Sequence, residues 1–249
     1  MAHKTEQTSN HNPYDEQIPS SKWGEDIQIN SELVERNLEK IKKNIAPCKP
    51  RIIGVTKYYG LSSIINGYKA GLRDFGESRA GDAINKIKPL PDEIRENSKF
   101  HFIGHLQTNK AEKVVEYFDY IHSVDSLKLA KVISEKALEL NKQQKILLQV
   151  NNAGEIQKFG YDKSHLVDEF DELKMLEGLD IVGLMNMAPL GAEPDELCRL
   201  FCDLREFRNF LENKFSVKLP ELSMGMSDDY LYAVKEGATM IRIGRKLFK

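Results

Sequence analysis

The chain has 249 residues, of which 41% are hydrophobic and 30% charged, and its 36 basic and 38 acidic side chains give a net charge of −2. This length suffices for one large core or two modest ones, and a single α/β barrel is an ordinary solution at this size. The balanced charge indicates neither a basic face for nucleic acid nor a patch for a membrane surface, so any affinity for phosphate has to be local.

The sequence predicts a cytoplasmic protein with reduced thiols. No apolar stretch approaches the roughly 20 residues that cross a bilayer, and the first 25 residues contain neither a signal-peptide core nor an Arg-rich transit pattern. The three cysteines, Cys48, Cys198 and Cys202, are too few and too scattered for a disulfide framework. Cys198 and Cys202 stand four apart on a predicted helix without further ligands nearby, so we interpret them as apolar-face residues rather than a metal site.

Residues 1–25 are rich in Ser, Asn, Gln, Lys and His and lack periodic apolar content, which predicts a disordered extension outside the fold. The predicted domain spans residues 26–249. It begins with a helix over 27–45, where apolar residues recur at helical spacing and Ser31 is a candidate N-cap.

After this helix, eight short β-rich runs alternate with helical patterns. The expected strands lie at 51–57, 74–78, 100–104, 120–124, 145–151, 179–187, 219–225 and 239–244. The expected helices between them lie at 61–71, 79–88, 109–118, 126–141, 164–175, 195–215 and 228–237. The strands are mostly continuous apolar runs, as is typical of parallel strands covered by helices. The alternation therefore predicts a single α/β domain with a (β/α)8 TIM-like barrel, and a doubly wound open sheet is the alternative.

The last two predicted strands each end in a small loop. The loop residues are Ser223, Met224 and Gly225 in one, and Gly244 and Arg245 in the other. Phosphate is commonly bound by these two loops in such barrels. Glycine lets the backbone approach an oxyanion, free N–H groups donate hydrogen bonds, and a helix starting near Asp228 adds its dipole. A glycine after a strand can also be no more than a turn.

Lys57 ends the first predicted strand, so we expect its side chain at the same face of the barrel as these loops. A lysine whose ammonium is desolvated becomes a neutral amine and a Schiff-base nucleophile, whereas a strand-end lysine can also simply reach to solvent. The phosphate-sized loops on the same face favour the first interpretation. Together they predict a site for a phosphorylated aldehyde such as pyridoxal 5'-phosphate (PLP).

Arg242 lies two residues before Gly244, so on a strand both residues face the same side, roughly 7 Å apart. Its guanidinium could donate to a pyridine nitrogen, which would keep that nitrogen unprotonated and weaken the cofactor as an electron sink. The alternative is an arginine that closes the barrel by pairing with a carboxylate.

The histidines do not indicate a metal site. His101 and His105 would be about 13 Å apart on a strand, too far to share a metal ion. His122 and His165 stand alone in the sequence, which favours structural roles for both. The sequence shows neither a Ser–His–Asp arrangement nor a G-x-G-x-x-G fingerprint.

Several motifs of this chain resemble those of the pyridoxal phosphate homeostasis proteins, the single-domain relatives of the alanine racemase N-terminal barrel. They are GVTK at 54–57, FGES at 75–78, FHFIGHLQTNK at 100–110, IHSVDS at 121–126, LQVN at 148–151, GLMNMAP at 183–189, LSMGMSDD at 222–229 and the final RIG. The resemblance covers nearly everything from about residue 30 to residue 248.

The resemblance implies that Lys57 forms the internal aldimine with PLP and that Arg242 partners the pyridine nitrogen. The implied phosphate site consists of Ser223 and the backbone around Met224, Gly225, Gly244 and Arg245. Ser78 and Asn151 complete the implied cofactor-binding set. Three positions depart from the family pattern: Ser78 replaces the usual Asn, Arg245 replaces Ser or Thr, and Tyr59-Gly60 stand where a proline is usual.

The sequence thus predicts a PLP-binding protein that buffers or delivers the cofactor without strong catalytic turnover. A racemase needs a second base, which in the related racemases comes from an additional domain that we do not expect here. The alternatives are a slow PLP-dependent racemase or lyase using Tyr58 or Tyr59, a cofactor-free Schiff-base aldolase, and a regulatory module that binds partner enzymes. We expect a monomer, with apo forms of PLP-dependent enzymes as candidate recipients.

Overall fold

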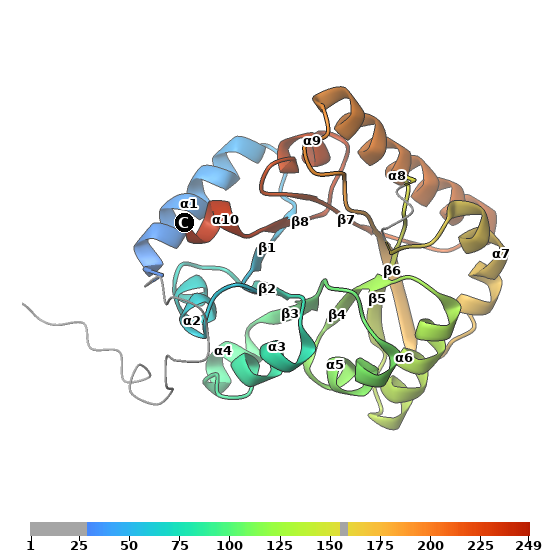
Figure 1. Cartoon of the computed structure of the whole chain (residues 1–249), viewed down its shortest axis with the longest axis horizontal. Helices are drawn as coiled ribbons and strands as arrows, with labels where there is room; N and C mark the ends of the chain where they lie inside the picture. Colours follow the sequence, from blue (N-terminus) through green and yellow to red (C-terminus); the bar gives the residue numbers. More distant parts are fainter. Residues whose placement is uncertain (1–28, 155–158) are drawn as a thin grey trace, which may run out of the picture.

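The computed structural model describes residues 29–154 and 159–249, so the predicted extension over 1–25 lies outside the described residues. Eight parallel strands close a barrel in chain order, with helices around it (Figure 1). The strands are β1 Arg51–Val55, β2 Asp74–Glu77, β3 Lys99–Phe102, β4 Tyr120–Val124, β5 Gln144–Gln149, β6 Leu179–Met185, β7 Glu221–Met226 and β8 Met240–Ile243. The predicted (β/α)8 barrel is confirmed, and the open sheet is excluded because β1 pairs with β8.

The predicted helices are present between the strands, and the structure adds two short helices. In chain order, the helices are α1 Ser31–Ile45, α2 Ser62–Lys69, α3 Ala80–Ile87, α4 Asp92–Glu96, η2 Thr108–Lys110, α5 Ala111–Tyr117, α6 Leu127–Glu139, α7 Lys163–Leu173, α8 Pro194–Phe215, α9 Tyr230–Lys235 and α10 Arg245–Phe248. The helices α4 and α10 were not predicted, because one turn is too short to show an apolar period.

The leading helix α1 packs across the outside of the seam where the barrel closes, beside α10 (Figure 1). It buries Val34, Leu38, Ile41 and Ile45, which recur at helical spacing. The predicted N-cap Ser31 is wrong by one residue: the side chain of Asn30 accepts a hydrogen bond from the Glu32 amide at 2.8 Å.

The core has two parts. A large layer lies between the sheet and its helices, and a small apolar cluster fills the inside of the barrel. The buried members of the inner cluster are Ile53, Tyr120, Leu147, Val182, Met185 and Met240. Because side chains alternate along a strand, the residues two positions from these also face inward, and several of them are polar.

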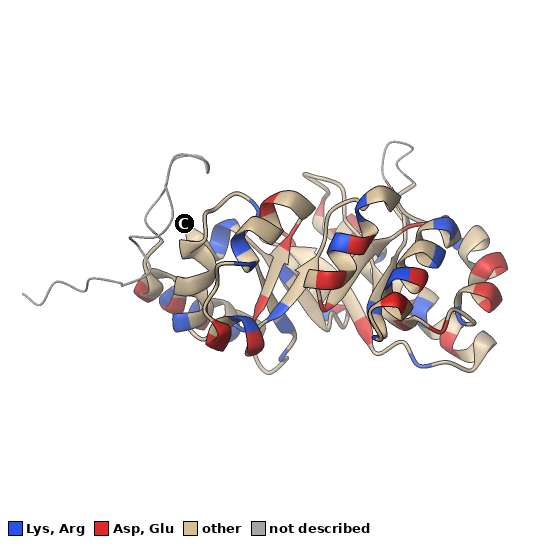
Figure 2. Ribbon diagram, turned by 90° about the horizontal axis from the view of Figure 1, so that it is seen from below, with Lys and Arg blue, Asp and Glu red and all other residues tan. Residues whose placement is uncertain are grey.

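Charged side chains cover the helices with both signs interspersed, and Figure 2 shows no face of a single sign in that view. Within the described part of the chain, no helix combines the length and apolar character needed to cross a membrane.

Candidate functional site

The carboxyl ends of β1 and β8 meet at one rim of the barrel. Gly54 pairs with Ile243, and a Cβ atom placed on Gly244 would lie 3.5 Å from the carbonyl oxygen of Val55. Lys57 follows Val55 by two residues, so it leaves the barrel at the rim where the Gly244 turn lies. The prediction that Lys57 and the Gly244 turn share one face is therefore confirmed.

Lys57 lines a cavity of about 290 Å³ at this rim, at the lower end of the range of roughly 300–1,000 Å³ for small-molecule sites. Its Nζ atom lies 5.0 Å from the centroid of the Tyr58 ring, within cation–π distance. Ser78 shares the cavity. The other lining residues are Arg79, Ile103, Gly104, His105, Gln149, Phe159 and Met187.

A buried ion pair supports the backbone that carries Lys57. Lys86 of α3 is 2% exposed, pairs with Glu77 of β2, and donates to the carbonyl oxygens of Thr56 at 2.9 Å and Tyr59 at 3.2 Å. The Thr56 hydroxyl donates to the same Glu77 carboxylate at 2.6 Å. Burial raises the pKa of Glu77, against the opposing effects of Lys86 and Thr56. The sequence analysis missed this cluster, whose only signal is a lysine at an apolar position of the helical pattern.

The second phosphate loop has the expected place but an additional partner. The Gly244 amide donates to the Ser227 hydroxyl at 3.3 Å, and α10 begins directly after it at Arg245. The first amides of a helix lack acceptors within it and can donate to an anion. Arg245 turns its guanidinium to Asp228 at 2.5 Å, and both side chains are about two-thirds exposed. The sequence analysis missed Ser227, although a serine directly after an apolar strand run is a usable signal.

The first predicted phosphate loop is placed wrongly by the sequence, because its three residues lie within β7 rather than after it. Ser223 faces the barrel interior, fully buried, and Met224 packs in the outer core. Gly225 has φ +87°, and a Cβ there would lie 2.5 Å from the Cβ of Ala233. Only glycine fits where β7 turns towards α9, so Gly225 shapes the turn that presents Ser227.

Arg242 also points into the barrel and is 4% exposed. Its Nη1 donates to the Ser223 hydroxyl at 2.7 Å, and its Nη2 donates to the carbonyl oxygen of Asn186 at 2.8 Å. Burial lowers the pKa of Arg242 to about 10, so the guanidinium keeps its charge at neutral pH. The partners of these two bonds are neutral, which differs from the alternative of an arginine paired with a carboxylate.

Asn186, which directly follows β6, holds a second unexpected feature. Its side-chain amide donates to Asn152 at 3.1 Å, while its buried Oδ1 atom has no hydrogen-bond partner within the described residues. An orphaned acceptor on the residue whose carbonyl oxygen binds Arg242 fits a site that is completed by a bound polar molecule.

The structure separates Asn151 from the Lys57 cavity. Asn151 follows β5, donates its amide to the carbonyl oxygen of Tyr161 at 2.9 Å, and lines a different hollow of about 530 Å³ bordered by α7 and α8. Lys57 and Ser78 thus share one cavity, Arg242 and Ser223 meet inside the barrel, and Asn151 lines a different hollow.

No group of side chains in residues 29–154 and 159–249 could hold a metal ion. His101 faces the barrel interior, whereas His105 lies at the rim, 3.3 Å from Asp125 and stacked on Phe159. His165 pairs with Glu169 on the surface of α7. All three cysteines are free thiols.

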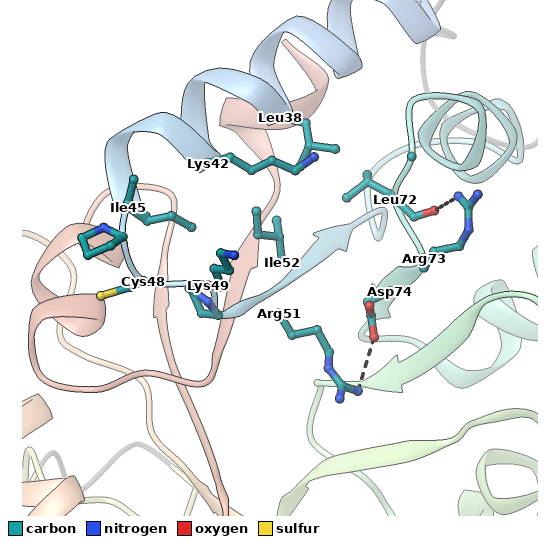
Figure 3. Close-up of a pocket in the computed structure, with 14 residues that line it drawn as sticks. Leu38, Lys42, Ile45, Cys48, Lys49, Arg51, Ile52, Leu72, Arg73 and Asp74 are labelled. Carbon is teal, nitrogen blue, oxygen red and sulfur yellow. Dashed lines mark hydrogen bonds and ion pairs between the residues drawn. The ribbon is translucent and has the colours of Figure 1, made fainter.

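A further cavity of about 450 Å³ opens at the opposite rim, between α1 and the first residues of β1 and β2 (Figure 3). Its walls are largely apolar, with Leu38, Ile45, Ile52 and Leu72 among them. Arg51 and Asp74 lie at its edge and pair at 3.5 Å (Figure 3). This end of the barrel holds the amino ends of the strands, which in such barrels serve stability rather than chemistry.

The comparisons with known proteins agree with this fold. The family model for the alanine racemase N-terminal domain matches residues 29–249. A pyridoxal phosphate homeostasis protein of Synechocystis is 43% identical over 202 residues, covering 81% of this chain and 92% of that protein. Its counterpart in Aquifex aeolicus is 37% identical over 198 residues, covering 80% and 86%.

Among solved structures, PipY of Synechococcus elongatus with PLP bound has a TM-score of 0.80 and 39% identity, covering 87% of this chain and all of that one. The segment matched by the family model, residues 29–249, contains the whole barrel described above. The chain therefore belongs to the pyridoxal phosphate homeostasis protein family, within the alanine racemase N-terminal domain fold.

Proposed function

We propose that this protein binds PLP at the carboxyl rim of the barrel, through a Schiff base on Lys57, and serves intracellular PLP homeostasis by buffering and delivering the cofactor. The parallel pairing of β1 with β8 carries this proposal. Among the described residues, Lys57 is the only lysine that lines the rim cavity, and this pairing brings it beside the Gly244 turn, whose amides can hold a phosphate. The relatives named for PLP homeostasis and the PLP-bound PipY structure support it.

The phosphate would be held by the amides of Gly244 and Arg245 and by the Ser227 hydroxyl, which lies next to the Gly244 amide. Small-residue turns and helix starts bind phosphate without a large basic patch, in keeping with the net charge of −2. Ser223, Met224 and Gly225 would contribute from within β7, by anchoring Arg242 and by shaping the turn. Ser78 would border the ring from the Lys57 cavity, and Asn151 would act from the neighbouring hollow.

Arg242 is the residue that favours storage over turnover. PLP supplies an electron sink when its ring nitrogen is protonated, and a guanidinium that stays charged up to about pH 10 can only donate to that nitrogen. The rival acid/base Tyr58 is 73% exposed, and burial raises the pKa of Tyr59, which disfavours its phenolate form. The proposal includes a cytoplasmic monomer that hands PLP to apo forms of PLP-dependent enzymes.

An absorption spectrum of the purified protein with and without added PLP tests the covalent attachment. Borohydride reduction and peptide mapping should then place the label on Lys57. The buried Lys86 provides an internal control, because its amine is occupied by Glu77 and two carbonyl oxygens. Label on Lys86, or an unchanged spectrum in Lys57→Ala, would refute the role of Lys57, whereas Lys49→Ala at the opposite rim should behave like the wild type.

Deuterium exchange at the α-carbon of several amino acids tests the claim of weak turnover. We expect the PLP-loaded protein to exchange the α-proton slowly, and we expect Tyr58→Phe and Tyr59→Phe to exchange it at the same slow rate. Rapid wash-out that either tyrosine variant abolishes would instead favour a racemase or lyase.

A further inference from the structure

A chain of hydrogen bonds crosses the barrel interior from Arg242 to the opposite rim. The Arg242 guanidinium contacts the Ser223 hydroxyl at 2.7 Å, and that hydroxyl lies 2.8 Å from Nδ1 of His122. Nε2 of His122 lies 2.9 Å from Nδ1 of His101, and Nε2 of His101 lies 2.9 Å from Oδ1 of Asp74. The five residues come from β8, β7, β4, β3 and β2, and Ser223 and both histidines are at most 1% exposed.

The chemistry of the two ends restricts the protons between them. An arginine can only donate, and an ionised aspartate can only accept. Burial lowers the pKa of His101 and lowers that of His122 well below its usual value, which favours the neutral form of both rings at neutral pH. A neutral imidazole carries one N–H group, so each ring can donate on one side and must accept on the other.

Asp74 therefore determines the direction of the bonds from His101 to the Ser223 hydroxyl, while Arg242 can only donate to Ser223. The His101 Nε2–H group donates to Asp74, which leaves Nδ1 of His101 as the acceptor for His122. His122 must then carry its proton on Nε2 and accept at Nδ1 from the Ser223 hydroxyl. The hydroxyl proton points at His122, and the oxygen lone pairs of Ser223 are left for Arg242. Without the aspartate, the reverse arrangement would also satisfy both rings, and the Ser223 hydroxyl could turn elsewhere.

Two neighbours of the chain hold its far end. Arg51 pairs with Asp74 at 3.5 Å and donates to the Tyr120 hydroxyl at 3.1 Å, and the Tyr120 ring stacks on His101 with 4.6 Å between centroids. Figure 3 shows this Arg51–Asp74 pair at the edge of the cavity on the amino side of the barrel. The chain thus joins the rim opposite Lys57 to the guanidinium expected at the cofactor ring.

We propose that Asp74, His101 and His122 are positioning residues for the cofactor site, which fix the Ser223 lone pair that holds Arg242 in its place for the ring nitrogen. This proposal rests on the proposed binding of PLP. A barrel interior filled only by side chains such as Leu147 and Met240 would satisfy packing without desolvating four polar groups, so the polar chain calls for a role beyond stability.

Nitrogen-15 NMR of the histidine side chains in the full-length, PLP-free protein tests the direction of the chain without relying on PLP. We expect His101 and His122 to be neutral with the proton on Nε2 at neutral pH. A proton on Nδ1 of either ring, or a charged imidazolium, would overturn the proposal. Because this measurement uses the wild type, its outcome does not depend on whether a variant folds or whether PLP binds.

Absorption titrations with PLP then test the consequence at the site. Asp74→Ala removes the acceptor and should weaken PLP binding by about tenfold or more, the scale of one charge-assisted hydrogen bond. Asp74→Asn keeps an acceptor oxygen and should restore both the Nε2–H forms and most of the affinity. Asp180→Ala is the matched control, a half-buried aspartate near the start of β6 and outside the chain.

Wild-type affinity in Asp74→Ala, or equal losses in Asp74→Ala and Asp180→Ala, would overturn the proposal. If the wild type itself binds no PLP, the proposed function fails, while the NMR result still decides the direction of the hydrogen bonds. If Asp74→Ala does not fold, the comparison of Asp74→Asn with the wild type decides, and a tenfold loss there would count against the proposal because the acceptor is retained.

Discussion

Two buried polar clusters support the two halves of the candidate site, and they differ in charge and in reach. The Glu77–Lys86 pair lies between the sheet and α3, carries two opposite charges, and holds the backbone around Lys57. The chain through His101 and His122 lies inside the barrel, contains two imidazole rings whose pKa is lowered by burial, and holds the side chain of Arg242. A buried ion pair therefore supports the Lys57 amine, whereas a chain of hydrogen bonds supports the Arg242 guanidinium. Each half of the site can be disrupted separately.

The largest expected effect comes from breaking the charged cluster. Lys86→Met leaves the Glu77 carboxylate buried without its ion-pair partner, and such a loss typically costs about 3–5 kcal/mol. Urea unfolding should show this loss of unfolding free energy. Lys88→Met, at an exposed position just past the same helix, should change the stability little.

The double variant Glu77→Leu/Lys86→Met separates the uncompensated charge from the lost packing. It should recover much of the stability, because an apolar pair of similar volume often replaces a buried ion pair at little cost. It should still weaken attachment of PLP at Lys57, since the carbonyl oxygens of Thr56 and Tyr59 lose their donor. A double variant as unstable as Lys86→Met would contradict this account.

Ser223→Ala breaks the hydrogen-bond chain inside the barrel at its junction with Arg242. The substitution leaves a guanidinium nitrogen and the His122 ring without their partner inside the barrel, which should cost roughly 1–3 kcal/mol of unfolding free energy. Thermal or urea unfolding measures the change. An effect no larger than that of Ser227→Ala at the rim would show that the interior bonds add nothing to stability.

Ser227→Ala sharpens the comparison from the rim. The Ser227 hydroxyl lies beside the Gly244 amide, so its removal should weaken PLP binding by roughly 1–2 kcal/mol, the scale of one hydrogen bond to a charged group. Titration with inorganic phosphate as a competitor would show whether the loss concerns the phosphate end. If inorganic phosphate competes with PLP as strongly in Ser227→Ala as in the wild type, this serine does not belong to the phosphate site.

The two clusters also differ in their response to pH. Burial holds the folded-state pKa of His101 and His122 below the ordinary value near 6.5, so below that pH the unfolded chain binds protons that the folded chain does not. The contribution of the two histidines to the free energy of unfolding is fully present above about pH 6.5. It falls as the pH drops towards the folded-state pKa, by at most about 1.4 kcal/mol per pH unit for each histidine.

Comparing His122→Gln with the wild type isolates this contribution. The free energy of unfolding of the variant should fall less steeply between pH 6.5 and pH 5, while His165→Gln on the surface of α7 should keep the wild-type slope. The raised pKa of Glu77 acts with the opposite sign, but it is present in all three proteins and cancels. Equal slopes in the wild type and His122→Gln would show that the pKa of His122 does not differ between the folded and the unfolded chain.

The outer layer of the fold could be predicted from the sequence, whereas much of the interior could not. Apolar periods located all eight strands and placed Lys57 at the correct rim, because those patterns record burial against helices. The pairing of His101 with Asp74 and of His122 with Ser223 joins residues 27 and 101 positions apart, for which no local pattern exists. Ser223, Met224 and Gly225 were assigned to a loop at the end of the predicted strand 219–225, because Gly225 resembles a strand end, while the strand continues to Met226.

The smallest expected effect comes from Arg245, where the family usually has Ser or Thr. Its ion pair with Asp228 is exposed on both sides, so Arg245→Thr should change the unfolding free energy by less than about 1 kcal/mol. PLP affinity should also stay close to that of the wild type, because the backbone amide of residue 245 is retained and the guanidinium points to Asp228. A tenfold loss of affinity in Arg245→Thr, absent from Asp228→Asn, would show that the guanidinium turns towards the phosphate when PLP binds.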